Sequence, residues 1–373
     1  MKSSTKYKAD EHLPDIAFQV YVLGQAGLAV GQASLMHLNS DCRHPDLSNL
    51  FALTDVTKAV QDHLTQVNAD VATMRQLITQ PEKVPSVRIG RHCRKPYECP
   101  FHIHCWQGIT DQTIYHIPYL KRPREAELEA NGIQYVRDIP SGFTPGDKRA
   151  AAFVETVQQQ TVAVDSDAIQ AELEQLIYPL YFFDFETIDY AIPAFTGCKP
   201  YQQVPFQYSC HILEADGHLT HCDYLHTAAD DPREALVISL LDHIGGTGHL
   251  VAYNISFERG ILRHLAEQFL DYAEPLEQMA ERLWDQLAIF RRHYQDYRFG
   301  GSNSPKSVLP VVVPALSYKM LAVQNGAQAQ ALWEEMIAEQ ETAVKQKMIK
   351  QLRDYCHLDT LAMVEIHRAL LQG

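Results

Sequence analysis

The sequence contains no apolar run long enough to cross a membrane, and its N-terminus, MKSSTKYKADEHLPD, has no apolar signal core. We therefore expect a cytoplasmic protein with no membrane partner. Cysteine is scarce, at eight of 373 residues, which excludes a disulfide scaffold in a chain of this length. In a reducing compartment these cysteines would be free thiols or metal ligands. No internal repeat or long low-complexity tract is present, and the composition is that of an ordinary globular protein.

Positive charge is also in short supply. The 32 lysines and arginines face 46 aspartates and glutamates, for a formal net charge of −14. This balance argues against indiscriminate binding to polyanions. It does not exclude a nucleic-acid substrate, because carboxylates that carry metal ions can invert the local field. Basic residues do gather locally, for example in FRRHYQDYRFGGSNSPK at 290–306.

The order of apolar segments predicts the fold class of the C-terminal half. LYFFDFET indicates a strand, and the segment around Asp216 and Gly217 indicates a hairpin. A helix, a short strand (HLVAYN) and a second helix (SFERGILRHLAEQF) follow, with further helices at about 275–293 and 331–371. This order is typical of an α/β fold with a mixed sheet flanked by helices. At 373 residues the chain is long enough for two domains.

Two carboxylates interrupt the aromatic stretch YFFDFETIDY at 181–190. Asp184 and Glu186 are two residues apart on the expected strand, so they share one face while Phe183 and Phe185 point to the other. Two acids on a buried face are costly unless a positive charge lies between them. Mg²⁺ or Mn²⁺ would relieve the repulsion, since these ions prefer oxygen ligands.

Further acids and a phenol occur in contexts that could complete such a site. Glu258 lies in the first turn of a helix that follows a strand, and Tyr355 and Asp359 lie four residues apart on one helix face. His357 should point elsewhere, about 200° around the helix from Asp359. Each of these residues alone also has an ordinary structural interpretation, as a helix-dipole acid, a core tyrosine or a surface acid.

Three motifs together resemble those of the DnaQ-like 3′–5′ exonucleases. DFET, NISFE and YCHLD are similar to the three exonuclease motifs of that family, which has a ribonuclease H-like fold. WDQLAIFRRHY at 284–294 and SPKSVLPVVVPALSY at 304–318 resemble the segments that follow the second motif. The resemblance covers roughly 178–371 and implies a DnaQ-like domain at 173–373. One departure is that the second motif ends in Glu258, where the family usually has Asp.

The resemblance implies a divalent-metal-dependent 3′–5′ exonuclease that hydrolyses phosphodiester bonds of DNA or RNA with two Mg²⁺ or Mn²⁺ ions. Asp184 would bridge both ions, Glu186 and Asp359 would hold the ion that activates water, and Glu258 would hold or orient the other. Tyr355 would orient the attacking water.

The N-terminal half resembles the later part of a RecB-like nuclease core of the PD-(D/E)XK type. KSST at 2–5 and DIAFQVYVLGQAG, with Lys2 and Gln19, match the lysine of a Glu-x-Lys strand and a helix glutamine. The family's acid ligands would then lie before Met1. We therefore expect a truncated RecB-like α/β remnant at 1–110, followed by a helical connector at 111–172.

Three cysteines belong to the same resemblance. Cys93, Cys99 and Cys105, in RHCRKPYECPFHIHCW, are spaced like the last three ligands of the family's [4Fe–4S] cluster. The set is incomplete in this chain, since nothing around Cys42 resembles the family's first cysteine site. Zinc could instead bind the three thiolates with a histidine, and three free thiols in a loop are a further interpretation. The histidines in question are His92, His102 and His104.

Together the two resemblances point to a bacterial family of unknown function that fuses a RecB-like module to a DnaQ-like module, with this chain as its C-terminal portion. Nucleic acid is then the expected partner, together with a separate polypeptide that would supply the missing nuclease half. An alternative function is a non-catalytic protein, built on decayed nuclease modules, that binds nucleic acid or a partner.

Overall fold

The computed structural model describes residues 1–80, 82 and 84–372, and the chain divides into two compact units. The first unit comprises Met1–Gly108 together with Asp189–Gln202. The second comprises Ile109–Ile188 and the rest of the chain from Gln203 on. Residues 111–172, expected as a connector, thus belong to the same unit as the large sheet.

Two helices and a small sheet form most of the first unit. Helix α1 (Ala9–Gln25) packs against α2 (Thr57–Ile78) through small and β-branched residues, and β1 (Ser34–Leu38) pairs antiparallel with β2 (Phe51–Asp55). Short turns η1 (Arg91–Cys93) and α3 (His102–Cys105) follow. Near the start of the unit, Asp15 Oδ2 accepts from Lys2 Nζ at 2.6 Å and from Gln19 Nε2 at 3.2 Å.

The start of the second unit has a small hydrophobic core of its own. Ile114, Leu128, Val136 and Phe153 are at most 3% exposed and pack together. They come from short elements: η2 (Ile114–His116), α4 (Arg122–Ala130), η3 (Val136–Asp138) and α5 (Lys148–Gln159). After these, β3 (Val162–Val164) pairs antiparallel with β9 (Tyr294–Asp296), and α6 (Ser166–Leu173) leads to the main sheet.

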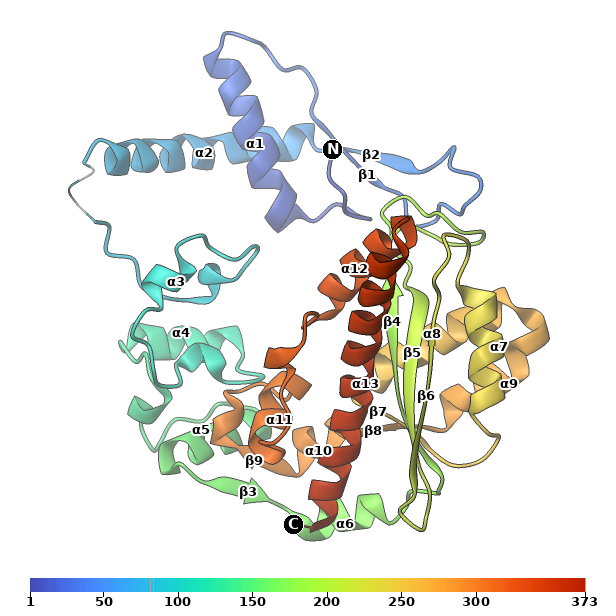
Figure 1. Cartoon of the computed structure of the whole chain (residues 1–373). Helices are drawn as coiled ribbons and strands as arrows, with labels where there is room; N and C mark the ends of the chain where they lie inside the picture. Colours follow the sequence, from blue (N-terminus) through green and yellow to red (C-terminus); the bar gives the residue numbers. More distant parts are fainter. Residues whose placement is uncertain (81, 83, 373) are drawn as a thin grey trace. The chain divides into compact units, whose positions relative to one another are not determined.

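A five-stranded mixed sheet dominates the second unit, in the order β6–β5–β4–β7–β8 (Figure 1). β4, β5 and β6 are antiparallel neighbours, whereas β7 and β8 continue the sheet parallel to β4. Gly217, at φ +88°, makes the hairpin turn between β5 and β6. The strands are β4 (Leu180–Ile188), β5 (Val204–Leu213), β6 (Leu219–Leu225), β7 (Leu250–Ala252) and β8 (Leu283–Asp285). The predicted α/β class with a mixed sheet flanked by helices is confirmed.

Helices cover both faces of this sheet, because alternate residues of β4 are apolar toward both sides. Tyr181, Phe183 and Phe185 pack against α7 (Arg233–His243), α8 (Ile255–Gln268) and α9 (Ala273–Glu281). Leu180 and Phe182 face the long C-terminal helix α13 (Thr342–Gln372), which runs along the other face (Figure 1). The elements that complete the unit are η4 (Leu270–Tyr272), α10 (Gln286–Arg292), η5 (Tyr297–Phe299), α11 (Pro305–Val312), η6 (Tyr318–Met320) and α12 (Gly326–Ala338).

In the described part of the chain, no helix is both long and apolar enough to cross a membrane.

Candidate metal centre

Strand β4 places Asp184 and Glu186 on the face that α13 covers. Asp184 lies opposite Ser209 of β5, and Glu186 lies opposite Gln207, directly before a bulge in the pairing. Glu186 is only 6% exposed. The aromatic residues between and beside the two acids point into the opposite core, so the strand divides its apolar and acidic side chains by simple alternation.

Helix α13 brings Tyr355 and Asp359 over the same face. Two buried glutamines fix the position of the helix: Gln207 Nε2 donates to the Leu352 carbonyl at 3.1 Å, and Gln286 Nε2 donates to the Met363 carbonyl at 2.9 Å. Tyr355 is 6% exposed and donates a hydrogen bond to the Asp359 carboxylate. The i, i+4 spacing therefore places the acid and the phenol together at the acidic face.

Glu258, in the first turn of α8, reaches this site from the end of β7 and is 3% exposed. Its carboxyl group and that of Asp184 are close enough to share a proton in a hydrogen bond. The Oε2 atom of Glu258 has no hydrogen-bond partner among the described residues. The longer glutamate, which departs from the motif's usual aspartate, therefore still points at Asp184.

Burial raises the pKa of all four acids. For Asp184 and Glu186 the rise is well above the usual range, and the charge of Asp359 adds to the effect of burial in both. Burial also raises the pKa of Glu258 to about 7, and that of Asp359 to about 7 although two phenol hydrogen bonds oppose it. Burial thus disfavours the charged form of all four carboxyl groups, and neighbouring acids of the group add to this effect for Asp184 and Glu186.

The donor set fits hard divalent cations. Four carboxyl groups supply oxygen ligands, and one of their oxygens is buried without a partner. Cys356 lies among them, with its sulfur within 4.8 Å of carboxylate oxygens of Asp184 and Glu186. Burial and the neighbouring acids raise the pKa of that thiol well above its usual range, so it remains protonated and is a poor ligand.

Sequence reasoning did not single out three residues at this site. Tyr318 donates a second hydrogen bond to Asp359, and Lys306, at the start of α11, lowers the pKa of Glu186 and Asp359. Both lie in the segment 304–318, and Lys306 also ends the basic stretch at 290–306. Cys356 lies within the YCHLD motif but has no ligand spacing, so only the packing of α13 reveals its position.

A groove with a mixed polar and apolar lining that includes one arginine lies within the same unit, with a volume of about 350 Å³. Arg291, Asn254, Tyr253 and Ser302 are among its lining residues. Burial raises the pKa of Asp285, and the nearby charge of Arg291 lowers it. The charge of Asp285 in turn raises the pKa of Glu258. Arg291 makes no ion pair with a described residue, so its charge faces the groove. Asn254 of this groove directly precedes α8, the helix that carries Glu258.

The cysteine segment of the first unit has a looser arrangement. Cys93 is buried, Cys105 is exposed, and the Cys99 N–H donates to the Cys93 carbonyl at 2.9 Å. Among the described residues, no group of ligand atoms within 4.8 Å of one another includes any of the three cysteines. A cluster or zinc ion held by Cys93, Cys99 and Cys105 stays a prediction.

Comparison with known proteins finds similarity to proteins described only as of unknown function or uncharacterised. Residues 181–304 match the family described as a domain of unknown function, DUF2779. The "Uncharacterized protein MG366 homolog" of Mycoplasma pneumoniae (strain ATCC 29342 / M129 / Subtype 1) is 28% identical over 208 residues, which are 50% of this chain and 31% of that protein. The chain thus spans about a third of the length of this curated relative. No solved structure matches.

Proposed function

We propose that this chain is a metal-dependent nuclease that removes nucleotides from the 3′ end of DNA or RNA, built on a ribonuclease H-like sheet. One observation carries the proposal: Asp184, Glu186, Glu258 and Asp359 come from three different elements and converge at a position where burial raises the pKa of all four. Burial of four like charges is unfavourable unless cations compensate it. The mixed sheet with an antiparallel β4–β5–β6 arm also suits this fold.

Two divalent ions would be held by these four carboxylates, with Asp184 at the centre of the group. When bound, such ions polarise a phosphodiester and lower the pKa of a water molecule. Tyr355 and Tyr318 hold Asp359 by donating to its carboxylate, which fixes this ligand before any ion arrives. Tyr355 is also the residue that the motif resemblance assigns to orienting the attacking water.

The charges around the acidic group favour a polyanionic substrate. Lys306 is exposed and close enough to lower the pKa of Glu186 and Asp359, so its ammonium group is available to a phosphate at the site. Arg291 supplies a further positive charge in the groove. Asn254, which is exposed in the same groove, offers an amide for hydrogen bonds. We infer that the substrate strand lies in this groove.

A second candidate function is a non-catalytic protein that binds nucleic acid or a partner. The glutamate at position 258 favours it, because an extra methylene changes where a carboxylate can hold an ion. Calorimetric titration of the metal-free protein with Mn²⁺ separates the two functions. We expect binding by the wild type and loss of that binding in Asp184→Asn, together with loss of Mg²⁺-dependent digestion of a labelled single strand. A folded wild type that binds no divalent ion at the acidic group would favour the non-catalytic function.

A separate polypeptide partner is part of the same proposal. The chain spans 31% of its Mycoplasma relative, so the relative has sequence beyond the matched part. Lys2 and Gln19 both bond to Asp15 in the first unit, which holds the lysine of the RecB-like resemblance in place. Co-purification of this chain with the product of the coding sequence immediately upstream tests this part of the proposal.

A further inference from the structure

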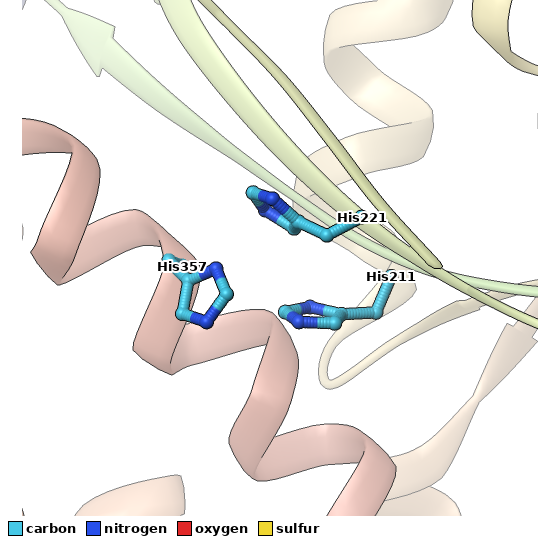
Figure 2. A group of neighbouring side chains, drawn as sticks. All are labelled: His211, His221 and His357. Atoms are coloured by element: carbon cyan, nitrogen blue, oxygen red, sulfur yellow. The ribbon is translucent and has the colours of Figure 1, made fainter. Parts of the chain in front are cut away.

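Three histidines meet on the α13 face of the sheet, apart from the four acids. His211 of β5 and His221 of β6 are directly paired across the hairpin, and His357 projects from α13 toward them (Figure 2). Their ring centroids are 4.4 to 4.7 Å apart. One potential ligand atom from each ring lies within 4.8 Å of the other two. Two strands and one helix thus present imidazoles to a single point.

The hydrogen bonds behind the rings allow an order of protons in which both strand histidines donate to a hydroxyl network. Thr360 Oγ1 lies 3.2 Å from the His357 carbonyl and 3.5 Å from the Cys356 carbonyl, and in this order it donates its proton to them. Thr360 Oγ1 then accepts from His211 Nδ1 at 2.8 Å and from Ser209 Oγ at 2.8 Å. Ser209 Oγ, having donated its only proton, accepts from His221 Nε2 at 2.9 Å.

This order of protons leaves lone pairs for a ligand. Nε2 of His211 and Nδ1 of His221 are the unprotonated nitrogens, and neither is needed by the Thr360–Ser209 network. Histidines that bind metals commonly donate their other ring N–H to a fixed acceptor in this way.

We propose that His211, His221 and His357 form a binding site for a divalent transition-metal ion of the zinc type. Imidazole nitrogen suits Zn²⁺, Co²⁺ and Ni²⁺, whereas the oxygen ligands of the neighbouring acids suit Mg²⁺ or Mn²⁺. Three protein ligands leave a coordination position for water. His211 is buried and His357 half-buried, but His221 is exposed, which provides a path for the ion from solvent.

The bound ion would join the β5–β6 hairpin to α13. That helix carries Tyr355 and Asp359, and His357 lies between them in sequence. Zinc would therefore stabilise the packing of α13 on the sheet. The inference rests on the histidines alone and does not require nuclease activity.

Zinc uptake by the full chain tests the proposal. Metal-free protein would be titrated with Zn²⁺ in excess Mg²⁺, so that the acids are not the preferred zinc site. All proteins would carry Cys93→Ser, which weakens zinc binding by the cysteine segment, and the chain with this substitution alone is the background protein. Four variants of the background protein would be compared with it: His221→Ala, His357→Ala, Asp184→Asn, and His218→Ala as a matched control in the same hairpin.

We expect one zinc ion per chain and a rise in melting temperature with zinc for the background protein, His218→Ala and Asp184→Asn. His221→Ala and His357→Ala should lose this ion, with affinity falling by at least about 100-fold, because each removes a ligand. Far-ultraviolet circular dichroism checks that the variants are folded. Equal zinc affinity and stoichiometry in the background and in both histidine variants would overturn the proposal, as would zinc uptake that depends on Asp184 alone.

Discussion

Glu258→Gln should stabilise the metal-free protein above neutral pH, although it removes a ligand of the proposed centre. Burial raises the pKa of Glu258 from 4.5 to about 7. At about 1.4 kcal/mol per unit, ionising this side chain in the folded protein costs about 3 kcal/mol once the pH exceeds 7. Glutamine has nearly the same shape and never ionises, so it avoids this cost.

The sign of the pH dependence follows from the raised pKa. Between about pH 4.5 and 7 the folded wild type holds a proton on Glu258 that the unfolded chain has lost, so stability falls as the pH rises through this window. The stability that this bound proton contributes is fully present below about pH 4.5 and is lost above about pH 7. Glu258→Gln lacks this fall, so the two proteins should be equally stable near about pH 4.5 and differ by up to about 3 kcal/mol near pH 8.

Urea unfolding in EDTA at a series of pH values measures this difference. Glu267→Gln, an exposed acid on the same helix, is the matched control and should change stability by less than about 0.5 kcal/mol at every pH. Saturating Mn²⁺ should stabilise the wild type more than Glu258→Gln, since binding to the folded state adds to stability. A Glu258→Gln protein that is less stable than the wild type at pH 8 in EDTA, or a difference independent of pH, would refute the reasoning.

Two further substitutions test how substrate and water are held. Arg291→Ala should raise KM for a single strand and reduce the slope of log affinity against log salt by about 0.7, as expected for one lost phosphate contact, with kcat little changed. The matched control Arg263→Ala, which replaces an exposed arginine on α8, should change neither KM nor the slope. Equal effects from both substitutions would contradict the proposal that the groove binds the substrate. Tyr355→Phe should lower kcat about 100-fold, as is typical when a group that positions a proton transfer is lost. Tyr318→Phe removes only the other hydrogen-bond donor to Asp359 and should lower kcat less. Equal losses of kcat would show that Tyr355 only holds the Asp359 carboxylate and does not orient water.

The sequence was sufficient to predict the α/β class, strand β4 and the local geometry of its acids, but not the whole sheet: Leu283–Asp285, expected within a helix at about 275–293, forms edge strand β8. That acids from three elements meet was implied by the motif resemblance. Alternation in YFFDFETIDY placed Asp184 and Glu186 on one face, and the i, i+4 spacing placed Tyr355 beside Asp359, because both periodicities are properties of a single element. The position of Glu258 depended on its place in the first turn after a strand. Local geometry of this kind is readable without knowledge of the tertiary structure.

Residues that reach the site through packing between distant segments could not be predicted in this way. Tyr318 lies at the start of η6, and Lys306 lies at the start of α11. No periodicity in the sequence shows that these segments lie close to α13. The histidine cluster combines a strand register with the rotation of a helix, and sequence reasoning on His357 stopped at the statement that it should point away from Asp359. Gln207 and Gln286, which hold α13 in place, also pair with residues 145 and 77 positions away.

Digestion of a single strand labelled at its 5′ end tests the central claim most directly. DNA and RNA strands would be incubated with the wild type and with Asp184→Ala, in Mg²⁺, Mn²⁺ or EDTA, after circular dichroism has shown both proteins to be folded. We predict a ladder that shortens from the 3′ end with the wild type in Mg²⁺ or Mn²⁺, and an intact strand with Asp184→Ala or EDTA. Digestion by Asp184→Ala at the wild-type rate, or intact DNA and RNA after incubation with folded, metal-loaded wild type, would contradict the claim.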